Sequence, residues 1–321
     1  MLKKEHITSI GGQAVLEGVM MRGPHKTAIA VRKPDDDILV DVQENASFVQ
    51  KYKINKIPLV RGVFAFVESM VLGVKSLMFS ADVVELEDDE GAEPSRFEKF
   101  LERVCGEHLK TVLIYFSVIV SLVFGVGVFM LLPTAVAGLI KNLFSNGGTN
   151  IVGNTVFINL LEGFIRIGIF LLYLVLVSKM EDIKTVFRYH GAEHKTIFCY
   201  ESGEELTVEN VRKQPRLHPR CGTNFLLIVM IVSIILFSFI SWSNVWTRMA
   251  MRLLLLPLVA GVSYEFIKII GRGKNKFVRA VTKPGLWLQL LTTAEPNDKQ
   301  IEVAIASVLP VIPENKEDDR W

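Results

Sequence analysis

Two short polar motifs contain the residues whose types and spacing could do chemistry. The first holds His190, Glu193 and His194, and the second holds His218 and Cys221. Histidines four positions apart share one helical face, with Cβ atoms about 6 Å apart, so both imidazoles can reach one metal ion. A histidine and a cysteine from the second motif would complete a four-ligand site of the zinc type. We therefore predict zinc as the cofactor, with the three histidines and the cysteine as ligands.

The first motif also fits the H-x-x-E-H pattern of inverted zinc metallopeptidases. In that chemistry two histidines hold the metal and the glutamate, here Glu193, activates the attacking water. Glu17 is a remoter candidate for the same catalytic role. Four ligands would close the coordination shell, as in a structural site, whereas a catalytic zinc keeps one position open. The sequence leaves the enzymatic and the structural alternatives open.

The composition indicates a membrane protein. The chain has 321 residues, half of them hydrophobic, and a mean hydropathy of +0.35. Soluble domains of this length are rarely so apolar. Four segments are long enough to cross about 30 Å of hydrocarbon. They run from about Thr111 to Ile140, Thr155 to Ser178, Phe225 to Ile240 and Met249 to Ile270.

The distribution of basic residues predicts the orientation of these spans. Lysines and arginines number 15 before the first span, eight in the loop 179–223 and eight after Ile270, against one in each of the two other loops. The positive-inside rule places both termini and the His-rich loop in the cytoplasm. All three cysteines lie on that reducing side, so disulfides are not expected. The net charge of +2 gives no indication of nucleic-acid binding.

The region before the first span is predicted to form a β-rich module and a helix. Lys26–Val31 and Ile38–Gln43 alternate apolar and polar residues around a turn-forming segment, as a hairpin requires. The glycine-rich segment 11–24 before them predicts tight turns or close backbone approaches. Apolar residues dominate 58–82, and an acidic linker follows at 85–93.

The segment 58–82 carries four charges spaced by seven residues, at Arg61, Glu68, Lys75 and Asp82. Such a spacing drifts by only about 20° per heptad, so the charges form one narrow stripe on a helix. We predict an amphipathic helix that lies in the cytoplasmic interface or packs under the helix bundle, with its stripe toward water. The alternative is a fifth span, which would place residues 1–56 outside.

Charged residues in and after the spans indicate further contacts. Glu162 and Arg166 lie four apart in the second span, which predicts an ion pair that fixes helix packing or marks a polar pathway. A basic cluster after the fourth span predicts contact with anionic lipids. The chain from Glu295 onward is predicted to be soluble, with 314–321 frayed. The residues of the basic cluster are Arg272, Lys274, Lys276 and Arg279.

Three separated motifs, at residues 11–24, 189–195 and 218–223, resemble the bacterial YqhQ-like membrane family. That family is of unknown function and is often labelled a predicted metal-dependent enzyme. The resemblance implies a multi-pass protein of the bacterial cytoplasmic membrane. It also directs attention to the polar residues of the motifs, which are Gln13, Glu17, Arg22, His190, Glu193, His194, His218, Arg220 and Cys221.

Together these patterns predict an α-helical multi-span membrane protein with about four transmembrane helices, a small β-rich N-terminal cytoplasmic module and an additional interfacial helix. Two function classes follow. The first is a metal-dependent hydrolase at the cytoplasmic face. The second is a non-catalytic scaffold or chaperone that binds a membrane-protein partner near the translocation machinery, with a structural His/Cys cluster. A transporter is a weaker third class. The predicted domains are 1–56, 57–110, 111–270 and 271–321.

Overall fold

The computed structural model forms two compact units. The sheet unit comprises residues 1–87, 174–232 and 256–321, and the helical unit comprises residues 88–173 and 233–255. The structure describes residues 7–45, 57–88, 109–145, 155–239, 245–272, 276–315 and 317–319.

The N-terminal module is a four-stranded antiparallel sheet whose strands pair in chain order. The predicted hairpin is confirmed, with Ala30 opposite Val40 in its register. The glycine-rich segment forms a second hairpin, which turns at Glu17 with a φ of 45°. The strands are β1 (Gly11–Val15), β2 (Gly18–Arg22), β3 (Lys26–Arg32) and β4 (Ile38–Glu44).

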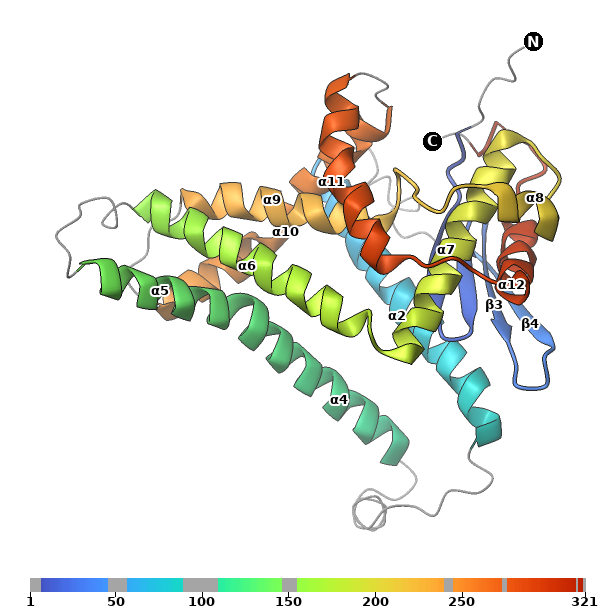
Figure 1. The fold of residues 1–321 in the computed structure, drawn as a ribbon, viewed down its shortest axis with the longest axis horizontal. Coiled ribbons are helices and arrows are strands. Elements are labelled where there is room, and N and C mark those ends of the chain that lie inside the picture. The colour runs from blue at the N-terminus through green and yellow to red at the C-terminus, as the bar shows by residue number, and fades with distance from the viewer. Residues whose placement is uncertain are drawn as a thin grey trace. The chain divides into compact units, whose positions relative to one another are not determined.

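Helices cover both faces of the sheet, as Figure 1 shows. Val19 and Met21 belong to the core under α7 (Glu181–Ser202) and α12 (Asp298–Val308). The intervening Met20 belongs to a second core, on the side packed by Leu72, Phe79, Val83 and Val84 of α2 (Val60–Asp88). Successive strand residues point to opposite faces. The sheet is therefore the buried centre of its unit.

The predicted His-rich loop 179–223 is largely helical. It contains α7 and α8 (Val208–Lys213) and ends at the start of α9 (Gly222–Ser238). Gly191 of α7 lies where the chain passes from α11 (Lys276–Thr292) to α12. A Cβ at this position would lie 2.1 Å from the carbonyl oxygen of Ala294, so only glycine fits. The last helices that the structure describes are α12 and η5 (Leu309–Val311).

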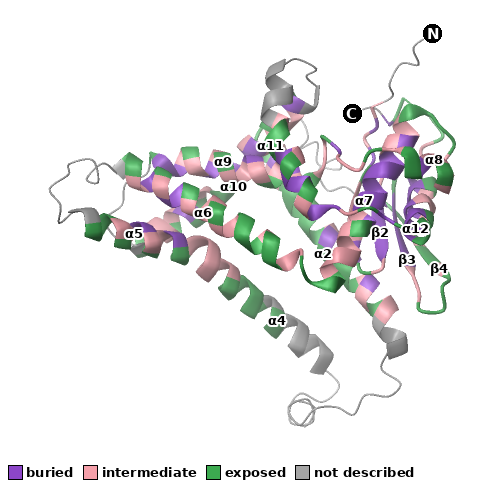
Figure 2. Ribbon diagram, viewed as in Figure 1, coloured by how far each residue is buried: buried purple, intermediate pink, exposed green. Residues whose placement is uncertain are grey.

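Among the residues that the structure describes, four helices are long and apolar enough to cross a membrane, and with the N-terminal sheet they confirm the predicted fold class. Many of their large apolar residues are exposed. Figure 2 colours parts of α4 and α6 as exposed. The four are α2, the run of α4 (Leu109–Val126), η3 (Gly127–Leu131) and α5 (Leu132–Ser145), α6 (Thr155–Val177), and α10 (Val245–Arg272).

For two helices, the length and hydropathy seen in the structure differ from the sequence-based prediction of which segments span the membrane. The helix α9, predicted as a span at 225–240, has only 17 residues and falls short of the usual length. The helix α2, predicted to be interfacial, meets the length and hydropathy requirement. Hydropathy alone does not distinguish these cases, because an apolar helix face can be covered by protein as well as by lipid.

The predicted exposure of the charged stripe on α2 was wrong for two of its four residues, Arg61 and Glu68, which form ion pairs with other elements. Arg61 pairs with Glu265 of α10, with its Nε 2.6 Å from Oε1. Glu68 pairs with Arg22 of β2 at 2.8 Å. Both partners come from elements distant in the sequence, so the spacing along α2 could not reveal them. Lys75 and Asp82 are exposed, as predicted.

The predicted fraying of the tail was also wrong for residues 317–319. Asp319 is fully buried, and its carboxylate accepts hydrogen bonds from the Thr8 hydroxyl at 2.6 Å, the Ser9 amide at 3.0 Å and the Tyr200 hydroxyl at 2.9 Å. One C-terminal side chain therefore joins the segment before β1 to α7.

Two predictions fall outside the described parts of the chain. The helix α2 continues to Asp88 through the first half of the predicted acidic linker, and the rest of the linker is not described. The predicted lipid contacts lie outside the residues whose side chains the structure describes. They involve Arg272, Lys274, Lys276 and Arg279.

Candidate functional site

The helix α7 presents His190 and His194 one turn apart, with ring centroids 4.4 Å from each other. Cys221 approaches them from the segment that leads into α9. One ligand atom from each of the three residues lies within 4.8 Å of the other two. Two imidazole nitrogens and one sulfur at this separation match the donor set of a zinc site, whose metal–ligand bonds are about 2.0–2.3 Å long.

The hydrogen bonds of the two imidazoles orient their Nε2 atoms for metal binding. His190 Nδ1 lies 2.8 Å from the carbonyl oxygen of Thr292, and His194 Nδ1 lies 2.5 Å from that of Arg216. Each Nδ1–H therefore donates to a carbonyl, so Nε2 is the ring nitrogen that would carry the lone pair for a metal. Second-shell contacts of this kind accompany most metal-bound histidines.

The two Nε2 atoms have different surroundings. His190 Nε2 lies 3.1 Å from the Cys221 sulfur and can accept a hydrogen bond from the thiol. His194 Nε2 is buried and has no hydrogen-bond partner among the described residues. A buried polar atom without a partner carries a desolvation penalty, which an unseen water or ion often relieves. The orphaned nitrogen fits a ligand that the protein's own residues do not supply.

His218 lies beside this group but outside it. Its ring centroid is 5.7 Å from that of His194, yet its Nε2 lies 3.3 Å from Arg220 Nη2 and 3.6 Å from Glu201 Oε2. Burial lowers the pKa of His218 to about 4, although Glu201 partly opposes that effect. Gln289 exchanges two hydrogen bonds with the His218 backbone. The structure thus groups three of the four predicted ligands.

Glu193 projects from α7 next to the ligands. Its Oε2 lies 3.9 Å from His190 Nε2, and its Oε1 accepts a hydrogen bond from the Gly12 amide at 3.1 Å. Burial raises the pKa of this carboxyl above its ordinary value, and His190 and the Gly12 N–H only partly counter the effect. A Cβ at Gly12 would lie 2.8 Å from Glu193 Cγ, so glycine is needed where β1 meets α7.

Glu17, the second predicted catalytic residue, lies in a different place. It occupies the turn between β1 and β2, where its carboxylate accepts a hydrogen bond from the Tyr189 hydroxyl at 3.1 Å. It is not among the residues that line the cavity beside His194 and Cys221. Its contacts connect the hairpin to α7.

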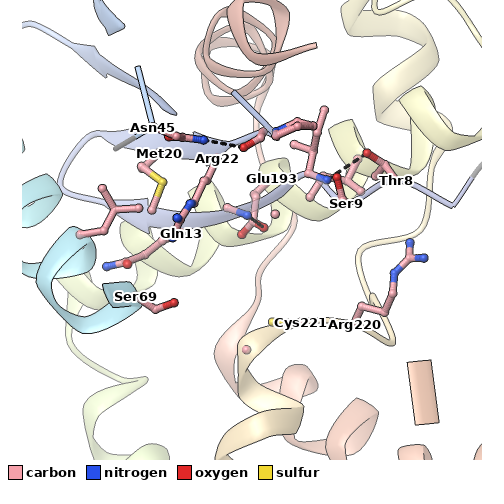
Figure 3. A pocket seen from close by; sticks show the side chains of 18 of the residues that line it. Thr8, Ser9, Gln13, Met20, Arg22, Asn45, Ser69, Glu193, Arg220 and Cys221 are labelled. Carbon is pink, nitrogen blue, oxygen red and sulfur yellow. Dashed lines mark hydrogen bonds between the residues drawn. The ribbon is translucent and has the colours of Figure 1, made fainter. Parts of the chain in front are cut away.

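A cavity of about 850 Å³ lies beside the three-residue group, and Glu193, His194 and Cys221 all line it. The three predicted motif residues Gln13, Arg22 and Arg220 line it too, and Figure 3 shows them with Ser69 of α2. The walls therefore come from the sheet, from α7, from the segment before α9 and from α2.

The two cavity arginines are held by carboxylates that the sequence did not reveal. Arg22 pairs with Glu68, and Arg220 pairs with Glu201, which also accepts the Thr8 amide at 2.9 Å. Glu201 lies seven residues beyond His194 on α7, which is about two helical turns. This spacing, which places both side chains on one helix face, was the sequence signal that could have identified Glu201 as part of the site.

The predicted intramembrane pair, Glu162 and Arg166, lies in the helical unit, whereas His190, His194 and Cys221 belong to the sheet unit. Arg166 Nη2 lies 3.2 Å from Glu162 Oε1, which confirms the pair. Glu162 also binds Arg252 of α10 through both carboxylate oxygens, one of them at 2.9 Å. This third member was missed because α6 and α10 are separated by about 90 residues in the sequence.

The comparisons with known proteins point to one family. The model of the family described as "Protein of unknown function (DUF1385)" matches residues 57–314. The chain is 36% identical to "Uncharacterized protein YqhQ" of Bacillus subtilis (strain 168) over 298 residues, which are 92% of this chain and 90% of that protein. No solved structure matches the chain. The chain therefore belongs to the DUF1385 family.

Proposed function

We propose that this protein is a zinc-dependent hydrolase of the bacterial cytoplasmic membrane, with His190, His194 and Cys221 as the metal ligands. The single observation that carries the proposal is the orphaned Nε2 atom of His194, buried within ligand distance of the two other donors. Nitrogen and thiolate donors favour zinc over magnesium or calcium, which take oxygen ligands. A zinc ion held by these three groups would supply Lewis-acid chemistry.

The number of ligands supports an enzyme over a structural zinc site. A structural zinc is bound by four protein ligands, and His218 was the predicted fourth. Its Nε2 instead lies near Arg220 and Glu201. Three protein ligands leave one coordination position for water or substrate, and the cavity lies next to two of these ligands.

Glu193 is placed to move the proton that hydrolysis requires. The reaction takes one proton from the attacking water and delivers one to the leaving group. Glu193 is buried beside the proposed ligands, and burial raises its pKa. A carboxyl with a raised pKa takes a proton from water more readily than an ordinary carboxylate does, and it can then give that proton to the leaving group. Arg22, Arg220 and Gln13 would orient the polar part of the substrate in the cavity.

We infer the membrane topology from the number of bilayer crossings between elements that share one core. The sheet and α7 share one core, so the chain must leave and re-enter on the same side of the bilayer. Between them lie three apolar segments, α2, α4–α5 and α6, and only an even number can cross. Because α2 packs its second half against the sheet, we infer that α4–α5 and α6 cross as a pair.

The same argument applies to α9 and α10, which connect α7 to α12 of the same core. An even number of crossings allows both to cross or neither. Because α10 is long and apolar enough to span, we infer that both cross; the 17 residues of α9 give about 26 Å of helix, somewhat less than the hydrocarbon thickness. The excess of basic residues on the side of the sheet identifies that side as the cytoplasm. Both termini would then be cytoplasmic.

The test of the hydrolase compares Glu193→Gln with wild type in the full chain. Glutamine keeps the carbonyl that accepts the Gly12 amide but cannot transfer the proton. We expect unchanged zinc content and thermal stability, together with failure to complement a strain that lacks the gene. A variant that keeps its metal and complements fully would show that no proton transfer by Glu193 is needed. That result would leave the zinc with a structural role in a scaffold protein.

A further inference from the structure

A group of four charged side chains in the helical unit is not used by the proposed hydrolase. Glu162 of α6 is almost fully buried, and three arginines surround it: Arg166 at 3.2 Å, Arg252 at 2.9 Å and Arg248 at 3.9 Å. Thr134 donates a further hydrogen bond to the same carboxylate at 2.8 Å. We call these four charged residues the arginine cluster.

The arginine cluster has two more positive than negative charges, and nearby sequence does not compensate for them. Glu162 is the one acidic residue between Thr111 and Ser178, and residues 222–264 contain none. Unbalanced charge in an apolar helix bundle is strongly unfavourable unless a counterion or polar group relieves it. Arg166 obtains part of that relief from the carbonyl oxygen of Phe129, in the π-helical turn η3, at 3.0 Å.

The position of Arg248 shows where an anion would approach. It lies three residues into α10, about 5 Å from the helix start, and is the most exposed member of the arginine cluster. Trp246, two residues earlier, is 75% exposed. Tryptophan is enriched at the headgroup level of bilayers, so the end of α10 that carries Arg248 matches the depth of lipid phosphates.

We propose that the arginine cluster binds the phosphate group of an anionic phospholipid, with Arg248 as the contact that faces the lipid. Phosphate oxygens accept charge-assisted hydrogen bonds from guanidinium groups. One headgroup with net negative charge would reduce the excess charge of the arginine cluster. A free anion such as inorganic phosphate shares this chemistry but does not bring acyl chains to the apolar faces of the helices.

The experiment measures lipid binding to the full chain in neutral detergent by native mass spectrometry. It compares phosphatidylglycerol with phosphatidylcholine in the wild type and three variants. Arg248→Gln should weaken phosphatidylglycerol binding about tenfold, the equivalent of one lost charge-assisted contact. Arg248→Lys should retain most of the binding. Lys141→Gln, which removes an exposed charge of the same unit, should bind as wild type does.

Each other outcome overturns the proposal. Equal binding of the two lipids by the wild type would exclude recognition of anionic headgroups. Unchanged phosphatidylglycerol binding by Arg248→Gln would place the lipid elsewhere on the protein, for example on the basic segment after α10. A thermal-shift series with inorganic phosphate at matched ionic strength distinguishes the source of the anion. If phosphate alone stabilises the wild type as much as phosphatidylglycerol does, the arginine cluster takes a free anion.

Discussion

The Nε2 atom of His190 lies 3.1 Å from the sulfur of Cys221, although 31 residues separate them in the chain. Two different elements produce this contact. His190 is fixed on α7 by its hydrogen bond to the Thr292 carbonyl, and Cys221 immediately precedes the first residue of α9. The thiol also accepts hydrogen bonds from the Thr223 amide and hydroxyl at 3.5 and 3.4 Å. The contact between His190 and Cys221 therefore depends on the backbone conformation just before the first residue of α9.

Removal of the Cys221 sulfur should remove the metal. We expect the full chain to purify with about one zinc per molecule and Cys221→Ser to lose most of it, since serine is a poor zinc ligand. Cobalt-substituted wild type should show thiolate-to-cobalt absorption, and the variant should lack it. Cys199→Ser is the matched control, because Cys199 is buried in the sheet unit's core and lies outside the donor group.

Replacement of His218 tests the number of ligands. His218→Gln should keep the zinc, because its Nε2 lies near Glu201 and Arg220 rather than in the donor group. His194→Gln should lose it. Stability should fall in both variants, since both histidines are buried, so metal content measured by elemental analysis distinguishes them. Equal loss of zinc from the two variants would indicate a closed four-ligand site.

Local spacing predicted the part of the site that lies on one helix. His190, Glu193 and His194 share a face of α7 because residues three and four apart are neighbours on any helix. The second motif was correctly expected to return to them. It did not reveal which of its side chains would reach the donors, because that depends on Glu201 and Gln289, which lie far from His218 in the sequence.

For the fold as for the site, the sequence predicted local elements but not the contacts between distant ones. Alternation in β3 and β4 and the long apolar stretches identified the sheet and most of the apolar helices. The pairings that join distant elements were not accessible, as Arg61 with Glu265 and Glu162 with Arg252 show. A charge on a helix shows that a partner or water must be near, but spacing along that helix does not identify the partner.

Loss of the Asp319 carboxylate should destabilise the sheet unit. Asp319→Ala removes the buried carboxylate that accepts hydrogen bonds from the Thr8 and Tyr200 hydroxyls and the Ser9 amide, which should cost about 3 kcal/mol. The measurement is thermal unfolding in detergent. Asp318→Asn is the neighbouring control, because its exposed pair with His25 should contribute little. A similar melting temperature for both variants would mean that the buried hydrogen bonds do not stabilise the fold.

The contact between β1 and α7 should depend on Gly12 and not on Gly11. In Gly12→Ala the new methyl group would lie 2.7 Å from the Met20 carbonyl oxygen and 2.8 Å from Glu193 Cγ. Overpacking of this kind costs about 1–3 kcal/mol. It should also displace Glu193, so complementation should fall more than metal content does. Gly11→Ala meets no atom within 4 Å and should resemble wild type. Equal behaviour of the two variants would argue against close packing at this junction.

The topology of α2 can be tested by reporters inserted into the full chain after residues 92 and 147. The first position follows α2, and the second lies between α5 and α6. Because the sheet and α7 share one core and α2 packs against that sheet, an odd number of crossings between them is excluded. We expect a fluorescent protein to be bright after residue 92, and alkaline phosphatase to be active only after residue 147. Phosphatase activity after residue 92 would show that α2 crosses, so that α4–α5 or α6 does not. The sheet and α7 would still lie on one side of the bilayer, and the excess of basic residues would still identify that side as the cytoplasm.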